Sequence, residues 1–262
     1  MKQITFDRIL ASFIFFTRLP FWRLRQPPKE NYAAVVEYWP LTGWLTGTLM
    51  AATLWVGSLC LPYFVAVVLA VAVRMLLTGA LHEDGLADFF DGFGGGGSDR
   101  SRILAIMKDS HIGTYGVLGL AFYLLLLIGT LVSLPPMVAV VAIIAADPFS
   151  KLLAAQMVVL LPYARSEEEA KNKTVYRTPS IAARVSLAIQ GLLPAAVCFL
   201  FLNSQFSIFN PQFSILSSLL SSLLLILYIR HRLRGYTGDC CGAVCLMAEL
   251  TFYLTSCVVL SL

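Results

Sequence analysis

Long apolar stretches separated by short polar segments dominate the pattern of residues along this chain. A helix needs about 20 apolar residues to cross the hydrocarbon core of a bilayer, because each residue advances it by only about 1.5 Å. Seven stretches approach this length, at 39–60, 62–81, 114–134, 136–161, 186–203, 212–229 and 241–262. The pattern predicts an all-α, polytopic integral membrane bundle of about seven transmembrane helices, with short interfacial helices.

The first apolar run, residues 9–16, is too short to span a membrane. Asp7, Arg8 and Arg18 flank it, which favours an interfacial or re-entrant helix. The run also lacks a small-residue cleavage site, so we do not expect a removable signal peptide.

Tyr38, Trp39 and Trp44 lie close together near the start of the first predicted span. Tryptophan and tyrosine are enriched where membrane meets water, because one end of each ring is apolar and the other is polar. We therefore interpret these three residues as part of an aromatic belt.

The composition agrees with a membrane protein. Mean hydropathy is +0.78, and 58% of the 262 residues are hydrophobic while only 13% are charged, which is more apolar than a soluble domain requires. We find no internal repeat or soluble module, so we expect residues 1–262 to form one membrane domain with the lipid bilayer as a partner. The net charge of +4 suits anionic headgroups and does not indicate nucleic-acid binding.

Basic residues fall on alternate loops. All of the 19 except Arg74 and Lys151 precede the first predicted span or follow the second, fourth and sixth. The turns at 61–62, 134–136 and 203–212 carry no charge. Because lysine and arginine near span ends stay on the cytoplasmic side, we expect a multi-pass protein of the inner membrane with its N-terminus and charged loops in the cytosol.

The polar insertion 82–113 follows the second predicted span. We expect a helix at 84–93 that continues from that span, a break at the glycines 94–97, and a second short helix at 99–110 capped by Ser98. Charged side chains beside a membrane are costly and tend to be functional. This segment is therefore the expected active-site segment, facing the cytosol.

Asp84, Asp88 and Asp91 recur at i, i+4 and i+7, which places them on one face of a helix. Three like charges repel one another unless a cation compensates them, and hard divalent cations prefer carboxylate oxygens. The spacing predicts a Mg²⁺ site with these three residues as ligands. Asp109 is expected to be a further ligand or the general base, and Asp88 is the other candidate for the base.

Divalent ions held by carboxylates can neutralise a diphosphate and stabilise the charge that develops as a P–O bond breaks, so the chemistry indicated is phosphoryl or nucleotidyl transfer. The side chains expected to contact substrate or phosphate are Arg18, Arg74, Arg100, Lys108, His111 and Asp239. Alternatives stay open: the loop bases can pair with the aspartates in a solvated helix, Arg18 can anchor the interface, and Asp239 can cap the last helix.

Besides Arg74, three charged residues lie within predicted spans. Asp147 and Lys151, at i and i+4, can neutralise one another, as a structural pair or as a substrate contact. Glu249 lies deep in the last span, where a substrate contact is one role that the sequence leaves open. The six cysteines include no CxxC pair, so we expect neither a thiolate metal site nor persistent disulfides.

Ordered motifs along most of the chain resemble those of the cobalamin synthase family, the adenosylcobinamide-GDP ribazoletransferases. They stand at 16–20 (FTRLP), 39–43 (WPLTG), 78–88 (TGALHEDGLAD) with Asp91-Gly92, 107–116 (MKDSHIGTYG) and 235–243 (GYTGDCCGA). Lys108 and His111 stand where the family often has arginine, Tyr236 where it often has glycine, and Cys240-Cys241 where Thr-Leu is common. These departures blur which groups hold the phosphates.

The resemblance implies a Mg²⁺-dependent late step of cobalamin assembly. Adenosylcobinamide-GDP and α-ribazole, or its 5′-phosphate, would be the substrates, and GMP would be released when the ribazole 3′-hydroxyl attacks the phosphorus attached to cobinamide. By position, Asp84, Asp88 and Asp91 would bind the metal and diphosphate, and Asp109 would complete the acidic set. The preferred acceptor, the number of metal ions and the oligomeric state stay open, and a homo-oligomer is compatible with the sequence.

Two alternatives remain. A CDP-alcohol phosphotransferase also places spaced aspartates at the end of a span, but it normally has Asp-Gly-x-x-Ala-Arg, whereas residues 84–88 of this chain read Asp-Gly-Leu-Ala-Asp. A divalent-cation transporter would use intramembrane acids such as Asp147 and Glu249. Its ligands should lie near the midplane on broken helices, while the acids here gather at one interface.

Overall fold

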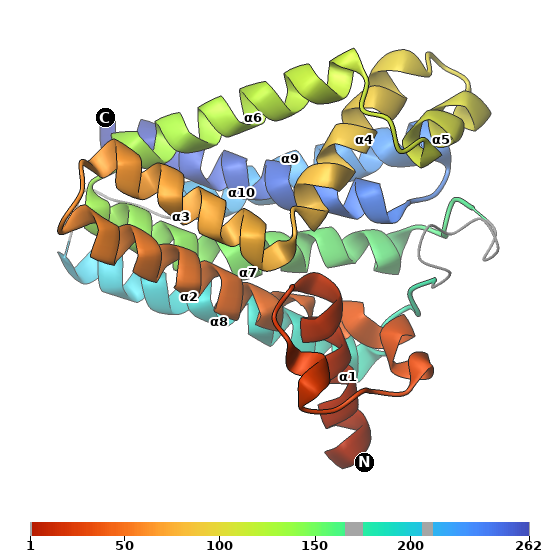
Figure 1. Ribbon diagram of the computed structural model, residues 1–262, viewed down its shortest axis with the longest axis horizontal. Coiled ribbons are helices and arrows are strands. Elements are labelled where there is room, and N and C mark those ends of the chain that lie inside the picture. Colours follow the sequence, from red (N-terminus) through yellow and green to blue (C-terminus); the bar gives the residue numbers. More distant parts are fainter. Residues whose placement is uncertain (1, 166–174, 206–211, 262) are drawn as a thin grey trace.

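The computed structural model describes residues 2–165, 175–205 and 212–261, and helices account for most of them (Figure 1). In chain order the elements are α1 (Lys2–Phe16), η1 (Phe21–Arg23), η2 (Lys29–Tyr38), α2 (Trp39–Ser58), α3 (Tyr63–Thr78), α4 (Leu81–Gly95), α5 (Arg100–Lys108), α6 (Thr114–Ser133), α7 (Pro136–Leu160), α8 (Ile181–Gln205), α9 (Gln212–Leu233) and α10 (Gly238–Ser261). Those ranges contain no β-strand, only an isolated bridge between Tyr163 and Tyr236. The expected all-α class is confirmed.

Five of the described helices, α6 to α10, are long and apolar enough to cross a membrane, and the bent pair α3 and α4 makes a sixth if it counts as one span. The sequence predicts about seven. The difference lies in α2, which forms over 20 residues as expected but carries three tryptophans, three glycines and several threonines that lower its hydropathy. The polytopic architecture is confirmed, with fewer qualifying helices than expected.

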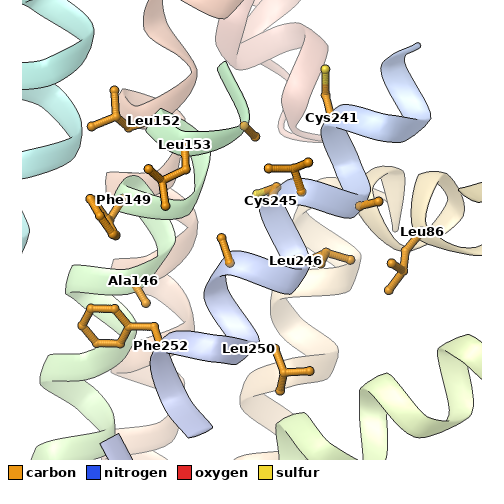
Figure 2. Close-up of a cluster of buried hydrophobic side chains, with 14 of the residues drawn as sticks. Leu86, Ala146, Phe149, Leu152, Leu153, Cys241, Cys245, Leu246, Leu250 and Phe252 are labelled. Carbon is orange, nitrogen blue, oxygen red and sulfur yellow. The ribbon is translucent and has the colours of Figure 1, made fainter. Parts of the chain in front are cut away.

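Helix α7 occupies the middle of the bundle. In the most apolar 18-residue stretch of α7, 83% of the residues are buried, against 28% in the corresponding stretches of α6, α8 and α9. Helices α2, α8 and α10 pack around α7. Figure 2 shows part of this core, where Phe252 of α10 reaches toward Ala146 of α7. The outer helices leave their apolar faces for lipid.

Two glycines allow α2 to approach α7 closely. A Cβ at Gly43 would lie 2.8 Å from the Cα of Pro148, and one at Gly47 would lie 3.0 Å from the Cβ of Asp147. Transmembrane helices associate through close packing of small residues, because lipid gives little hydrophobic drive for helix pairing. The spacing Gly43-x-x-x-Gly47 therefore provides the contact surface between these two helices.

A sharp bend separates α3 from α4. Gly79 (φ +63°) and Ala80 (φ +55°) both adopt the left-handed conformation, which ends α3 and turns α4 by 90°. The expectation that the acidic helix continues from the second span is wrong, because two successive left-handed residues cannot extend a right-handed helix. Helix α4 instead crosses the bundle between α10 and α6.

Helix α5 begins one residue later than expected and has a different cap. The Asp99 side chain accepts hydrogen bonds from the backbone N–H groups of Ser101 (2.8 Å) and Arg102 (3.4 Å). Ser98 is therefore not the N-cap, because the aspartate carboxylate occupies that position and offers a charged acceptor to the exposed N–H groups. Figure 1 places α1, α4 and α5 at one end of the bundle and the C-terminus at the other.

Candidate active site

A pocket lies at the end of the bundle where the N-terminal helices meet α4 and α10. Six elements or loops contribute to its wall: the end of α1, the start of α2, α4, the segment after α7, the segment before α8, and the start of α10. Its lining residues are Phe15, Phe16, Trp39, Leu81, His82, Asp84, Tyr163, Arg165, Tyr176, Gly238, Asp239, Cys241 and Gly242. The pocket therefore combines two carboxylates, one guanidinium and six aromatic rings.

Asp84 and Asp239, both predicted from the sequence, line this same pocket. Glycines bring their helices together: a Cβ at Gly85 of α4 would lie 3.0 Å from the Cα of Asp239, and one at Gly242 of α10 would lie 3.1 Å from the carbonyl oxygen of His82. Asp84 is exposed and makes no side-chain hydrogen bond or ion pair to any residue in the described ranges. Its oxygens are therefore available to a ligand.

Arg165 and Tyr163 reach the pocket through a short backbone pairing. Ala164 N–H donates to the carbonyl of Tyr236 at 2.8 Å, and Tyr236 N–H donates to that of Pro162 at 2.9 Å. The Arg165 guanidinium also donates to the Leu104 carbonyl at 2.9 Å. Burial raises the pKa of Tyr163, so the phenol stays neutral and can donate a hydrogen bond at ordinary pH.

Sequence reasoning missed both residues. It counted Arg165 only among the basic residues that follow the fourth predicted span, because nothing local to positions 163–165 shows that they pair with position 236. The available signals are Pro162, which ends the preceding helix, and the aromatic residues Tyr163 and Tyr236. Aromatic residues that pair after a helix end are compatible with an ordered connection.

A buried glutamate holds the segment that carries Tyr176. Glu37 accepts a hydrogen bond from the Arg177 guanidinium at 2.6 Å and lies 3.4 Å from that of Arg8. The Tyr176 ring meets the Phe15 ring edge to face, with centroids 6.0 Å apart. Burial raises the pKa of Tyr176 well above its usual value, so this second phenol is also neutral.

Phe16, Trp39 and His82 form a stack of nearly parallel rings. The Phe16 and Trp39 centroids are 4.9 Å apart at 7°, and those of Trp39 and His82 are 5.7 Å apart at 10°. The assignment of Trp39 to an aromatic belt is wrong, because the side chain is only 2% exposed and packs against α1 and α4. Trp44 differs: it is 38% exposed, and its indole N–H donates to the Gln190 carbonyl at 2.7 Å.

The stack contains two buried polar atoms without partners. Neither the indole Nε1 of Trp39 nor the Nε2 of His82 has a hydrogen-bond partner in the described structure. An unpaired polar atom in the interior is unfavourable, and both residues line the pocket.

The other predicted acids have different surroundings. Asp88 is half-buried on α4, one turn after Asp84. Asp91 is buried, and its two oxygens accept the backbone N–H groups of Gly113 (2.7 Å) and Gly116 (2.8 Å) at the start of α6. These contacts make Asp91 a capping residue of that helix.

Asp109 follows α5 with its side chain 58% exposed. It accepts hydrogen bonds from the His111 backbone N–H (3.0 Å) and imidazole (2.7 Å), and the bond from the imidazole lowers the pKa of this carboxyl. Such a carboxylate is a weaker base.

Within the described ranges, no three metal-liganding side chains gather into a preformed site, so the four aspartates do not form a closed metal cage.

Arg74 is buried in the bundle rather than exposed to the pocket. Its guanidinium forms ion pairs with Glu249 and, at 3.4 Å, with Glu83, and it donates to the Tyr123 hydroxyl at 2.8 Å. Tyr253 adds a hydrogen bond to Glu249 at 2.7 Å. Four helices therefore meet at a largely compensated charge cluster, and Glu249 finds a partner that the sequence did not identify.

The other predicted basic residues do not line the pocket. Arg100 donates to the carbonyls of Leu233 (2.7 Å) and Ala164 (2.6 Å), which ties α5 to the end of α9 and to the segment after α7. The exposed Arg18 side chain lies over Gly79, where a Cβ would come within 2.2 Å of its Nε. Lys108 is exposed at the end of α5.

Asp147 and Lys151 form a buried ion pair on α7, and Thr46 of α2 donates to Asp147 at 2.9 Å. Of the two interpretations left open by the sequence, this geometry favours the structural pair. Neither residue belongs to the pocket wall.

Comparison with known proteins agrees with the motifs. Residues 8–257 match the family model for cobalamin-5-phosphate synthase. The chain is 36% identical over 260 residues to an adenosylcobinamide-GDP ribazoletransferase of Shewanella baltica, covering 97% of this chain and 94% of the relative. The transferase of Shewanella oneidensis is 34% identical over 260 residues, with the same coverage. No solved structure matches. With a family match over nearly its whole length, this chain belongs to the cobalamin-5-phosphate synthase family.

Proposed function

We propose that this protein transfers the adenosylcobinamide phosphate group from adenosylcobinamide-GDP to the 3′-hydroxyl of α-ribazole or its 5′-phosphate. The observation that carries the proposal is the position of Asp84, an unpaired carboxylate in a pocket shared with Asp239 and Arg165. The names of the relatives, which cover almost the entire chain, support the choice of reaction.

The reaction exchanges one P–O bond for another. The ribazole 3′-oxygen forms a bond to the phosphorus attached to cobinamide, the bond from that phosphorus to the bridging oxygen breaks, and GMP leaves with that oxygen. The hydroxyl proton passes to a carboxylate. We assign this role to Asp88 in preference to Asp109, because Asp109 is held by His111 and its pKa is lowered.

The donor set at the pocket fits Mg²⁺. Magnesium is commonly bound through one or two carboxylates together with waters and substrate phosphates. Asp84 and Asp239 in the pocket wall, with Asp88 one turn further along α4, offer such a set. When bound, the ion would neutralise the diphosphate and lower the cost of charge on the leaving phosphate. Arg165 is the basic side chain in the pocket wall best placed to bind the phosphates.

We place the pocket on the cytosolic side of the inner membrane. The loops at its end of the bundle carry Arg100, Arg102, Arg165 and Arg177, whereas the turns at 61–62 and 134–136 have no charge. Retention of basic loops in the cytoplasm supports this orientation, and nucleotide-linked substrates are found in that compartment.

The test is turnover by purified protein reconstituted in lipid vesicles. Adenosylcobinamide-GDP with α-ribazole should yield adenosylcobalamin and GMP in equal amounts, detected by liquid chromatography and mass spectrometry. Product formation should stop with EDTA and return with Mg²⁺. CDP-diacylglycerol serves as the control donor: its consumption, without reaction of adenosylcobinamide-GDP, would refute the proposal in favour of a phospholipid transferase.

A further inference from the structure

The pocket wall is unusually rich in aromatic rings for a site that handles phosphates. One side of the wall is formed by the nearly parallel rings of Phe16, Trp39 and His82. Two half-buried rings complete it: Tyr163 follows α7, and Tyr176 precedes α8. Carboxylates and a guanidinium suffice for a diphosphate. The rings therefore need a different explanation, and planar ligands are bound well by stacking on aromatic side chains.

Fold stability alone does not account for the buried nitrogens. Trp39 is 2% and His82 5% exposed, and Trp39 Nε1 and His82 Nε2 have no partner in the described structure. The other indole of α2, that of Trp44, does have a partner, the Gln190 carbonyl. Because an indole N–H only donates, the group that satisfies Trp39 must carry an in-plane acceptor.

We propose that the Phe16–Trp39–His82 stack, with Tyr163 and Tyr176, is a binding site for a flat, fused-ring heteroaromatic base with an unsubstituted ring nitrogen or carbonyl at its edge. This inference rests on the proposed function, since both of its substrates carry such a base: guanine in the nucleotide donor and the benzimidazole in α-ribazole. The shared chemistry is a planar face for stacking and an acceptor for the Trp39 N–H.

The site lies beside the proposed reaction centre. Asp84 follows His82 by two residues on α4, and both line the same pocket. A base held on the aromatic wall would place the attached ribose or phosphate towards the carboxylates. Trp39, Tyr163 and Tyr176 then act as specificity residues, because they select a planar base before chemistry occurs.

The experiment measures binding of α-ribazole and, separately, of GMP to the reconstituted protein by isothermal titration calorimetry. Trp39→Phe keeps the ring and removes the N–H donor. Trp44→Phe makes the same change at an indole outside the pocket and serves as the matched control. We expect Trp39→Phe to weaken one of the two probes about tenfold, the effect of leaving an acceptor unpaired, while Trp44→Phe binds both like the wild type.

Tyr176→Leu is the second variant, because it removes a half-buried ring from the pocket wall without touching the buried stack. Loss of one stacking partner should weaken the same probe by about tenfold or more. Weakening of α-ribazole assigns the site to the acceptor, and weakening of GMP assigns it to the nucleotide. Wild-type affinity for both probes in both folded variants would overturn the inference.

Activity separates this inference from the proposed function. If wild-type protein converts adenosylcobinamide-GDP but the two variants bind and turn over normally, the aromatic site is refuted and the reaction stands. If wild-type protein binds a base in a Trp39-dependent manner but forms no cobalamin, the proposed function is refuted and the base site stands.

Discussion

The interior of the bundle and the pocket at its end treat carboxylates differently. Inside, Glu249 contacts Arg74 and Tyr253, and Asp147 contacts Lys151 and Thr46. At the pocket, Asp84 is exposed and has no side-chain partner among the described residues. A buried charge requires a partner because desolvation is costly, whereas an exposed carboxylate keeps its hydration until a ligand replaces it. The comparison separates acids that hold the fold from an acid available for chemistry.

The largest expected effect comes from breaking an interior pair. Glu249→Gln should destabilise the protein by about 3–5 kcal/mol, because it leaves the charge of the buried Arg74 guanidinium compensated only by the longer ion pair to Glu83. Thermal unfolding in detergent measures the loss. Glu30→Gln, the same change at an exposed position, should leave unfolding unaltered; equal stability of both variants would mean that the pair does not support the fold.

The reverse result is expected at the pocket. Asp84→Asn should reduce turnover by at least about a hundredfold, more than is typical for a residue that only supports a metal ligand, with no change in the unfolding midpoint. Asp99→Asn is the matched control, because asparagine caps a helix about as well as aspartate and Asp99 lies outside the pocket wall. Full activity of Asp84→Asn would remove the metal assignment.

Close packing of α2 on α7 can be tested with glycine substitutions. Gly43→Ala should cost about 1–3 kcal/mol of stability, because the new Cβ would lie 2.8 Å from the Cα of Pro148 and displace the helix beside Asp147. Gly129→Ala places a Cβ where no atom lies within 4 Å and should be neutral or slightly stabilising. Chemical unfolding curves compare the two, and similar curves would contradict the proposed role of Gly43.

The smallest effect concerns Asp91, which the spacing assigns to the metal and the contacts assign to the start of α6. As a cap, Asp91→Asn should keep both folding and most activity, and Asp91→Ala should lose about 1 kcal/mol of stability. As a metal ligand, Asp91→Asn should instead lose activity as severely as Asp84→Asn. Turnover rates of the two asparagine variants, measured at equal Mg²⁺ concentration, distinguish these roles.

Much of the fold follows from local pattern. The length of each apolar run predicts α6, α7, α9 and α10 to within a few residues, because helix length in a membrane is set by hydrocarbon thickness. The bend at Gly79–Ala80 was not predicted. Alanine at φ +55° is uncommon, so helical periodicity gives no reason to expect a left-handed residue at position 80.

The site was predicted in part for the same reason. Asp84 and Asp239 stand in local motifs, and the structure brings them to one pocket. Arg165 and Tyr176 flank a loop, and they reach the pocket only through the backbone pairing with Tyr236 and the ion pair to Glu37. Those contacts join residues far apart in sequence, so helical spacing gives no indication of them.

The most direct test of the central claim is a cryo-electron microscopy structure of the reconstituted protein with Mg²⁺ and a non-hydrolysable analogue of adenosylcobinamide-GDP. The account predicts density for the ion and the diphosphate against Asp84, with Arg165 and Asp239 around them. Diphosphate density elsewhere, with the pocket around Asp84 filled only by solvent, would contradict it.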